Sequence, residues 1–170
     1  MSHQLPIDMS LPREERLNSL REPLRALLDA ETLGWSNLAN MASALYAATS
    51  WHWIGFYLVD EHHDNLVLGP FQGPVACTRL FKGKGVCAAA WQTAQTQVVP
   101  DVHAFPGHVA CSSLSLSEVV IPIRNGAGRV AAVLDIDSSA LNDFGPGEVR
   151  ALEAMIEDVE RVWPSWTWGA

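Results

Sequence analysis

Two carboxylates alternate with apolar residues over 133–137, which read Val-Leu-Asp-Ile-Asp. Because alternate side chains of a β-strand share a face, Asp135 and Asp137 are expected on the same face, about 7 Å apart. At an effective dielectric constant near 20 their repulsion is roughly 2 kcal/mol, a sizeable fraction of a domain's stability. A compensating cation is therefore expected: an arginine or lysine of the chain, a metal ion or a ligand's ammonium group. A solvated acidic strand end is the alternative.

A third carboxylate, Glu118, begins the strand that is expected to pair with this one. Hard cations such as Mg²⁺ and Ca²⁺ take carboxylate ligands, but no stretch of the sequence resembles a calcium-binding loop. The sequence also has no Cys-x-x-Cys pair, and none of the six histidines has zinc-finger spacing to a cysteine. We therefore predict no metal site and no cofactor.

The three cysteines, Cys77, Cys87 and Cys111, do not form a disulfide framework, because their number is odd and a cytoplasmic compartment is reducing. Small buried hydrophobes are the simplest interpretation. Serines follow Cys111 closely, however, and a turn rich in hydroxyl and backbone donors can lower the pKa of a thiol and yield the reactive thiolate. His108 could assist as a base or anchor the loop. No papain-like context surrounds Cys111, so a Cys-His peptidase is not indicated.

The elements that position these residues follow from the hydrophobic periodicity. Apolar residues at three- or four-residue spacing predict a helix over 13–30, which Pro23 should kink or split. Further helices are predicted from Gly34, over 86–93 and from Gly145-Pro146. The stretch 101–116 is predicted to be a long, ordered loop.

Runs of aliphatic and aromatic residues predict the strands, which are 53–59, 66–68, 97–99, 118–123 and 129–137. Gly69-Pro70 should end the second of these, with a loop over 70–74. The turn 125–128, Asn-Gly-Ala-Gly, is a hairpin signal between the last two. The order of helices and hairpins predicts an α+β fold with helices packed on one antiparallel sheet.

The chain has 170 residues, 48% hydrophobic and 18% charged, which suits one compact domain. We expect an N-terminal tail over 1–12, a single domain over 13–163 and a tryptophan-rich tail over 164–170. That tail should dock against the body or against a partner subunit. A homodimer is expected, because exposed tryptophans and N-terminal leucines need cover.

A formal net charge of −8 argues against nucleic-acid partners and anionic membrane surfaces, since the few basic residues do not cluster. No apolar run approaches the roughly 20 residues of a membrane span. The N-terminus lacks the basic start and apolar block of a signal peptide. A cytoplasmic protein is predicted.

Five motifs follow one another along the chain. They are GPFQG with ACTR over 69–79, GKGVC over 83–87, VVPDVH with FPGH and AC over 98–111, SEVVIP over 117–122 and VLDIDS over 133–138. Together they resemble the free methionine-(R)-sulfoxide reductases, a stand-alone family built on a GAF domain. The likeness covers roughly Gly34 to Val162 and includes all three cysteines.

The resemblance implies a GAF-like fold with a six-stranded antiparallel sheet flanked by helices. It implies that Cys111 attacks the sulfoxide and that Cys77 is the resolving cysteine, while Cys87 matches a third thiol that can take part. The sequence departs from the family pattern at Ser112, where an Asp commonly follows the catalytic cysteine, and at Ala88, where a Gly commonly follows the third.

The substrate pocket of the family matches Glu118, Asp135 and Asp137 as its acidic residues, and Trp53 and Tyr57 as its aromatic wall. The implied reaction reduces free methionine (R)-sulfoxide to methionine through a cysteine sulfenic acid and a disulfide, which a thioredoxin-like dithiol reduces again. A GAF module that binds a small ligand without reaction is one alternative, and it would have the same fold. A structural or interaction protein that uses the tryptophan-rich tail is a second.

Overall fold

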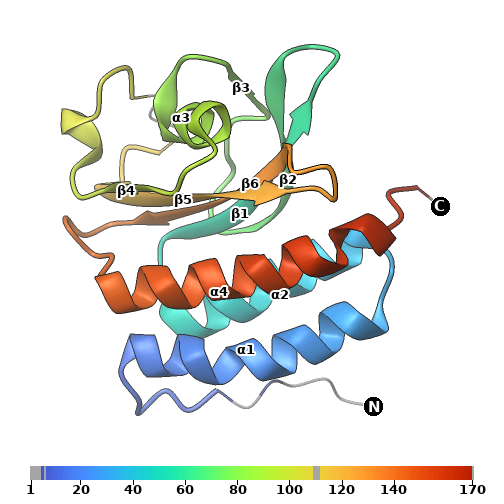
Figure 1. Cartoon of the computed structure of the whole chain (residues 1–170). Coiled ribbons are helices and arrows are strands. Elements are labelled where there is room, and N and C mark those ends of the chain that lie inside the picture. The colour runs from blue at the N-terminus through green and yellow to red at the C-terminus, as the bar shows by residue number, and fades with distance from the viewer. Residues whose placement is uncertain (1–4, 6, 109–111, 170) are drawn as a thin grey trace.

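The computed structural model describes residues 5, 7–108 and 112–169 (Figure 1). Its centre is a six-stranded antiparallel sheet with the strand order β3-β2-β1-β6-β5-β4. The strands are β1 (Trp53–Asp60), β2 (Asn65–Gln72), β3 (Arg79–Phe81), β4 (Gln97–Val99), β5 (Ser117–Arg124) and β6 (Val130–Ser138). The predicted α+β fold is confirmed.

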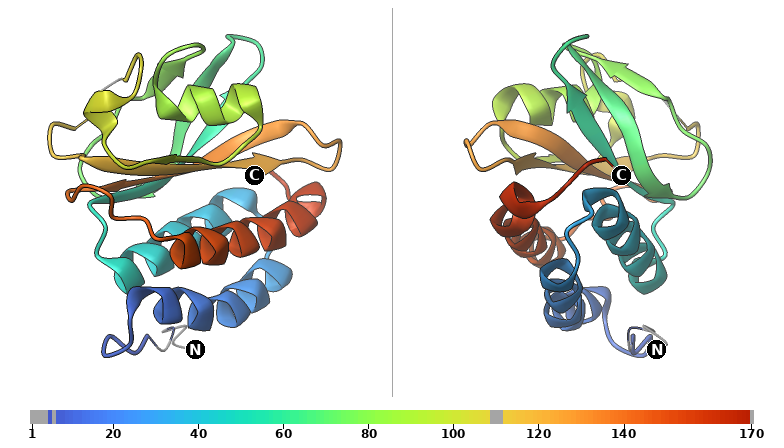
Figure 2. Two further views of the ribbon diagram at one scale, coloured as in Figure 1. Left: turned by 60° about the vertical axis from the view of Figure 1, so that its left-hand side comes forward. Right: turned by 90° about the vertical axis from the view of Figure 1, so that its right-hand side faces the viewer.

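Helices cover both faces of this sheet. They are α1 (Arg13–Ala30), α2 (Gly34–Thr49), α3 (Gly85–Thr93) and α4 (Pro146–Val162), with 3-10 turns at Val102–Ala104 and Trp163–Ser165. The helices α2 and α4 lie side by side against one face, α1 packs outside them, and α3 covers the other face (Figures 1 and 2). We refer below to the helical side, with α1, α2 and α4, and to the pocket side, with α3.

Each side of the sheet has its own apolar core. On the helical side, the alternating strand residues Ile54, Phe56, Leu134 and Ile136 are fully buried against leucines of the helices. On the pocket side a smaller cluster packs under α3, and it includes Trp53, Tyr57, Cys87, Val120 and Val133. The period of two along each strand thus divides the residues between a large structural core and a small one.

Pro23 does not split α1, which runs without a break from Arg13 to Ala30. Of the two predicted effects, a kink or a split, the split does not occur. Leu20, Leu24 and Leu28 on either side of the proline are buried in the core. Their packing offsets the backbone hydrogen bond that a proline removes from a helix interior.

Strand β2 continues past Gly69-Pro70 to Gln72, so the predicted stop and the start of the predicted loop at residue 70 are both wrong. The pairing with β1 shifts register between Gly55 and Tyr57, opposite Gly69 and Pro70. A proline is tolerated at such a bulge, because the ladder is already interrupted there. The three-residue strand β3 was not expected from the sequence, since it has no apolar alternation to detect.

The tryptophan-rich C-terminal segment packs on the chain's own body. Trp163 and Trp166 are buried, and Thr167 bridges to the connection between α1 and α2 through its backbone N–H, which donates to Thr32. Trp168 packs edge-on against Trp35, with ring centroids 5.4 Å apart. Across the described residues, no helix combines the length and apolar character needed to cross a membrane.

Candidate active site

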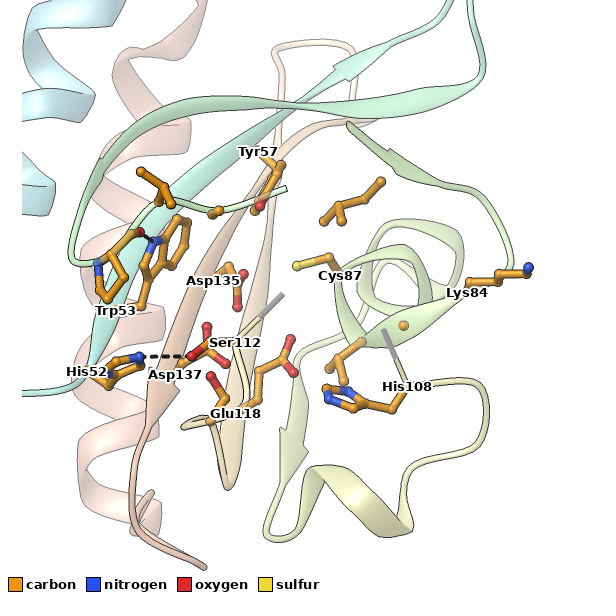
Figure 3. Close-up of a pocket in the computed structure, with 17 residues that line it drawn as sticks. His52, Trp53, Tyr57, Lys84, Cys87, His108, Ser112, Glu118, Asp135 and Asp137 are labelled. Carbon is orange, nitrogen blue, oxygen red and sulfur yellow. Dashed lines mark hydrogen bonds between the residues drawn. The ribbon is translucent and has the colours of Figure 1, made fainter. Parts of the chain in front are cut away.

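Three carboxylates meet on the pocket side because of the strand register. Glu118 of β5 lies directly opposite Asp137 of β6, and Val120 lies opposite Asp135. On the other flank of β6, Trp53 and Gly55 of β1 pair with Asp137 and Asp135. The alternation predicted for 133–137 therefore places both aspartates on one face, and Figure 3 shows all three carboxylates in one pocket.

Among the described residues, no arginine or lysine pairs with these carboxylates. Glu118 is 6% exposed and Asp135 7% exposed, and the ion pairs among the described residues include none of the three. Burial, reinforced by the charges of neighbouring carboxylates, holds the pKa values of Glu118 and Asp135 well above their usual range. Burial also raises the pKa of Asp137 to about 6, although a hydrogen bond from Ser115 and the charge of His52 oppose it. Protonated carboxyl groups are thus available near neutral pH.

The thiol of Cys87 enters the pocket from the first turn of α3. This helix begins at Gly85, whose φ of 80° favours glycine and whose N–H donates to the carbonyl of Gly107 at 3.0 Å. The Cys87 sulfur and one carboxylate oxygen each of Glu118 and Asp135 lie within 4.8 Å of one another. Burial and the charges of these carboxylates raise the pKa of the Cys87 thiol, so Cys87 is held as a thiol and not as a thiolate.

Aromatic rings line the wall beside the carboxylates. Trp53 stacks on Tyr57 with ring centroids 5.9 Å apart, and on Phe71 with centroids 5.4 Å apart. The indole N–H of Trp53 donates to the carbonyl of Pro74 at 3.0 Å, which fixes the ring. Gly55 leaves room for it, since an added Cβ would collide with the Trp53 ring and with Phe71. The pocket therefore offers an apolar wall next to a buried acidic floor.

Comparison with known proteins assigns this chain to a family. The family model described as GAF domain matches residues 38–163. The chain is 40% identical to the free methionine-R-sulfoxide reductase of Escherichia coli, over 84% of this chain and 86% of that one. A solved structure of the Neisseria meningitidis free methionine-R-sulfoxide reductase in complex with its substrate is 41% identical, covers 96% of this chain and 97% of that one, and superposes with a TM-score of 0.92.

The chain belongs to the GAF-domain family of free methionine-R-sulfoxide reductases. The resemblance carried by the five sequence motifs is confirmed. A further relative is the GAF domain-containing protein A of Dictyostelium discoideum, 51% identical over 85% of this chain and 90% of that one.

The residues assigned from the reductase resemblance lie as follows. Six line the pocket: Trp53, Tyr57, Cys87, Glu118, Asp135 and Asp137. Cys77 is half-buried next to the pocket-lining Ala76, and its carbonyl accepts a hydrogen bond from the Tyr57 hydroxyl at 3.0 Å. Cys111 lies outside the described residues. The described residues nearest to it on either side, His108 and Ser112, both line the pocket.

Two histidines also line this pocket in the reductase fold. His52, which the sequence did not single out, contacts the Ser112 hydroxyl through Nε2 at 3.2 Å and joins the start of β1 to the loop before β5. The Nε2 atom of His108 is buried and has no hydrogen-bond partner within 5, 7–108 and 112–169, and burial together with the charge of His103 lowers the pKa of its ring. Only the pairing of segments 60 residues apart brings His52 to the site, so no local pattern marks it.

Proposed function

We propose that this chain reduces free methionine (R)-sulfoxide to methionine, with Cys111 as the attacking thiol. As a member of the family it is an oxidoreductase. The observation that carries the substrate assignment is the pocket with three carboxylates, no cationic partner among the described residues and an aromatic wall beside them. An amino acid with a free ammonium group and an apolar thioether matches both features.

Recognition of the free amino acid depends on charge. A free ammonium group neutralises part of the buried carboxylate cluster, whereas methionine within a peptide has lost that charge to an amide. The rings of Trp53 and Tyr57 pack against the methyl group on sulfur, since aromatic rings favour sulfur-bearing groups. The preference for the R epimer is taken from the family alone.

The leaving oxygen of the sulfoxide needs a proton. Burial holds the pKa values of Glu118 and Asp135 well above their usual range, so a protonated carboxyl is present at neutral pH. One carboxyl donates this proton, and the remaining carboxylates bind the ammonium group. The cluster thus serves substrate binding and general acid catalysis at once.

Three features support Cys111 as the nucleophile. It is joined by one peptide bond to Ser112, which lines the pocket and is held by His52. Cys87, the thiol already in the pocket, is a poor nucleophile, because burial and the neighbouring carboxylates raise its pKa. A serine-rich turn after Cys111 supplies the donors that stabilise a thiolate.

The proposed first step is an oxygen transfer. The Cys111 thiolate attacks the sulfoxide sulfur and forms an S–S bond, while a carboxyl group protonates the sulfoxide oxygen. The protonated oxygen then moves to the cysteine sulfur as the S–O and S–S bonds to the substrate sulfur break, which releases methionine and leaves Cys111 as a sulfenic acid. The substrate sulfur gains the two electrons that the cysteine sulfur loses. The Cys77 thiol then condenses with the sulfenic acid, which forms a disulfide and releases water. A thioredoxin-like dithiol reduces this disulfide by exchange, in keeping with a cytoplasmic site of action.

A single-turnover experiment tests this assignment. Reduced enzyme is mixed with excess methionine (R)-sulfoxide and no external reductant, and the methionine formed per chain is counted. Cys111→Ser should form none, while Cys77→Ser should still form one methionine per chain and stop at the sulfenic acid. A full turnover by Cys111→Ser would refute Cys111 as the nucleophile. No methionine from the wild-type chain would instead favour a GAF module that only binds its ligand.

A further inference from the structure

We infer that Cys87, Glu118 and Asp135 form a binding site for one zinc ion, and that zinc bound there excludes the substrate. The inhibitory part of this inference rests on the proposed function, whereas zinc binding does not. The three ligands come from three separate elements, α3, β5 and β6, so their spacing in the sequence does not predict the site.

The ligand geometry suits a single ion. The Cys87 sulfur and one oxygen from each carboxylate lie within 4.8 Å of one another, and all three side chains are buried. Zinc binds thiolate sulfur at about 2.3 Å and carboxylate oxygen at about 2.0–2.2 Å, so the ligands of a tetrahedral ion lie about 3.5 Å apart. Small side-chain rotations therefore close the site. Figure 3 shows the Cys87 sulfur pointing from α3 toward Asp135.

A second observation concerns one oxygen within the cluster. The Asp135 carboxyl group is hydrogen-bonded to Cys87 and Glu118, but its Oδ1 atom is buried and has no hydrogen-bond partner among the residues that the structure describes. Buried polar atoms in proteins are nearly always paired, so this oxygen is free to bind a ligand. A divalent cation would satisfy this oxygen and neutralise the negative charge of the cluster.

The donor set selects zinc among the common divalent cations. Mg²⁺ and Ca²⁺ require six or more oxygen ligands and do not favour sulfur. Zinc accepts one thiolate with two carboxylates and leaves a fourth position for water, as in open sites.

Direct binding is measured on a chain that carries Cys87 as its sole thiol, the double variant Cys77→Ser/Cys111→Ser. The EDTA-treated chain is titrated with ZnCl₂ against a chromogenic zinc chelator at pH 7.5. We expect one zinc per chain and an increase in the melting temperature of the chain. Adding Cys87→Ser, or Glu118→Gln in a second variant, should weaken binding at least tenfold. MgCl₂ in the same titration should not bind.

Two results would overturn the inference: no zinc bound by the double variant, or equal zinc affinity with and without Cys87. This assay needs no turnover, so its outcome is independent of whether Cys111 is the nucleophile. In the wild-type chain, zinc should act as a competitive inhibitor that raises KM for methionine sulfoxide and leaves kcat unchanged. Inhibition that lowers kcat alone would contradict the overlap of the two sites.

Discussion

Asp158 and Asp135 are equally exposed, at 7% each, yet their surroundings differ completely. Asp158 lies in α4 on the helical side and accepts a hydrogen bond from Nε of Arg21 at 2.7 Å. Asp135 lies in β6 on the pocket side, where its Oδ1 atom has no hydrogen-bond partner in the part of the chain that the structure describes and two more carboxyl groups are its neighbours. The charge of Asp158 is thus neutralised within the fold, whereas Asp135 is available to bind a ligand.

The same contrast holds for the other acidic residues of the two sides. Arg13 of α1 binds both Asp143, which precedes α4, and Glu148 in the first turn of α4, with a distance of 2.9 Å to the Oδ1 atom of Asp143. No arginine reaches Glu118 or Asp137 among the described residues. The partly buried acids on the helical side thus have arginine partners within the fold, while the buried acids on the pocket side reduce its stability until a cation binds.

The largest effect is expected from the substrate. Acetylation of the amine removes the ammonium charge that the pocket-side carboxylates would neutralise, so kcat/KM for N-acetylmethionine (R)-sulfoxide should fall by about a thousandfold, or roughly 4 kcal/mol. Initial rates on the free and the acetylated compound, measured side by side, check this. Comparable rates would show that the cluster does not recognise the amine.

Substitution of the two matched aspartates should separate function from stability. Asp135→Asn should lower kcat/KM by about a hundredfold and leave the free energy of unfolding unchanged or raised, because a desolvated acid is removed. Asp158→Asn should keep kcat/KM but lower the free energy of unfolding by about 1–2 kcal/mol, since the partner Arg21 is partly exposed. Kinetics and urea unfolding on both variants check the pair. Equal loss of activity in both would contradict the division between the two sides.

The two sides should also respond to pH with opposite signs. Burial raises the pKa of Asp137 from 3.8 to about 6, so the folded chain binds more protons than the unfolded chain across that interval. Stability should therefore fall as the pH rises from about 4 to 6, by about 2–3 kcal/mol from this residue. Glu118 and Asp135, whose pKa values are raised further, extend the fall to higher pH.

On the helical side, burial opposes ionisation of Asp143, but hydrogen bonds from Arg13 and Ser138 hold its pKa below the usual value. Its contribution is present above pH 4 and is lost as the pH falls. Urea unfolding between pH 4 and 7 should show a shallower decline for Asp137→Asn than for the wild type. An identical decline in both would remove Asp137 as its source.

Much of the fold was predictable, because the local periodicity of apolar residues indicates helices and strands. The bounds of α1 and the start of α2 follow from leucine spacing, and the shared face of Asp135 and Asp137 follows from strand alternation. The predictions that failed concern elements whose pairing partners are distant in sequence. The strand β3 and the extension of β2 through Pro70 exist only because neighbouring strands provide pairing and a bulge.

For the site, the sequence by itself determined the residue types and the strand face of the carboxylates, and the family resemblance supplied Trp53, Tyr57 and Cys87. Only the tertiary structure decided that Glu118 lies opposite Asp137, that the Cys87 thiol approaches Asp135 and that His52 reaches Ser112. The physical reason is that burial and charge neutralisation are properties of the assembled neighbourhood. A sequence shows that Asp135 and Asp158 are both acids. Only the packing places Arg21 beside Asp158 and places Asp135 in a ligand pocket.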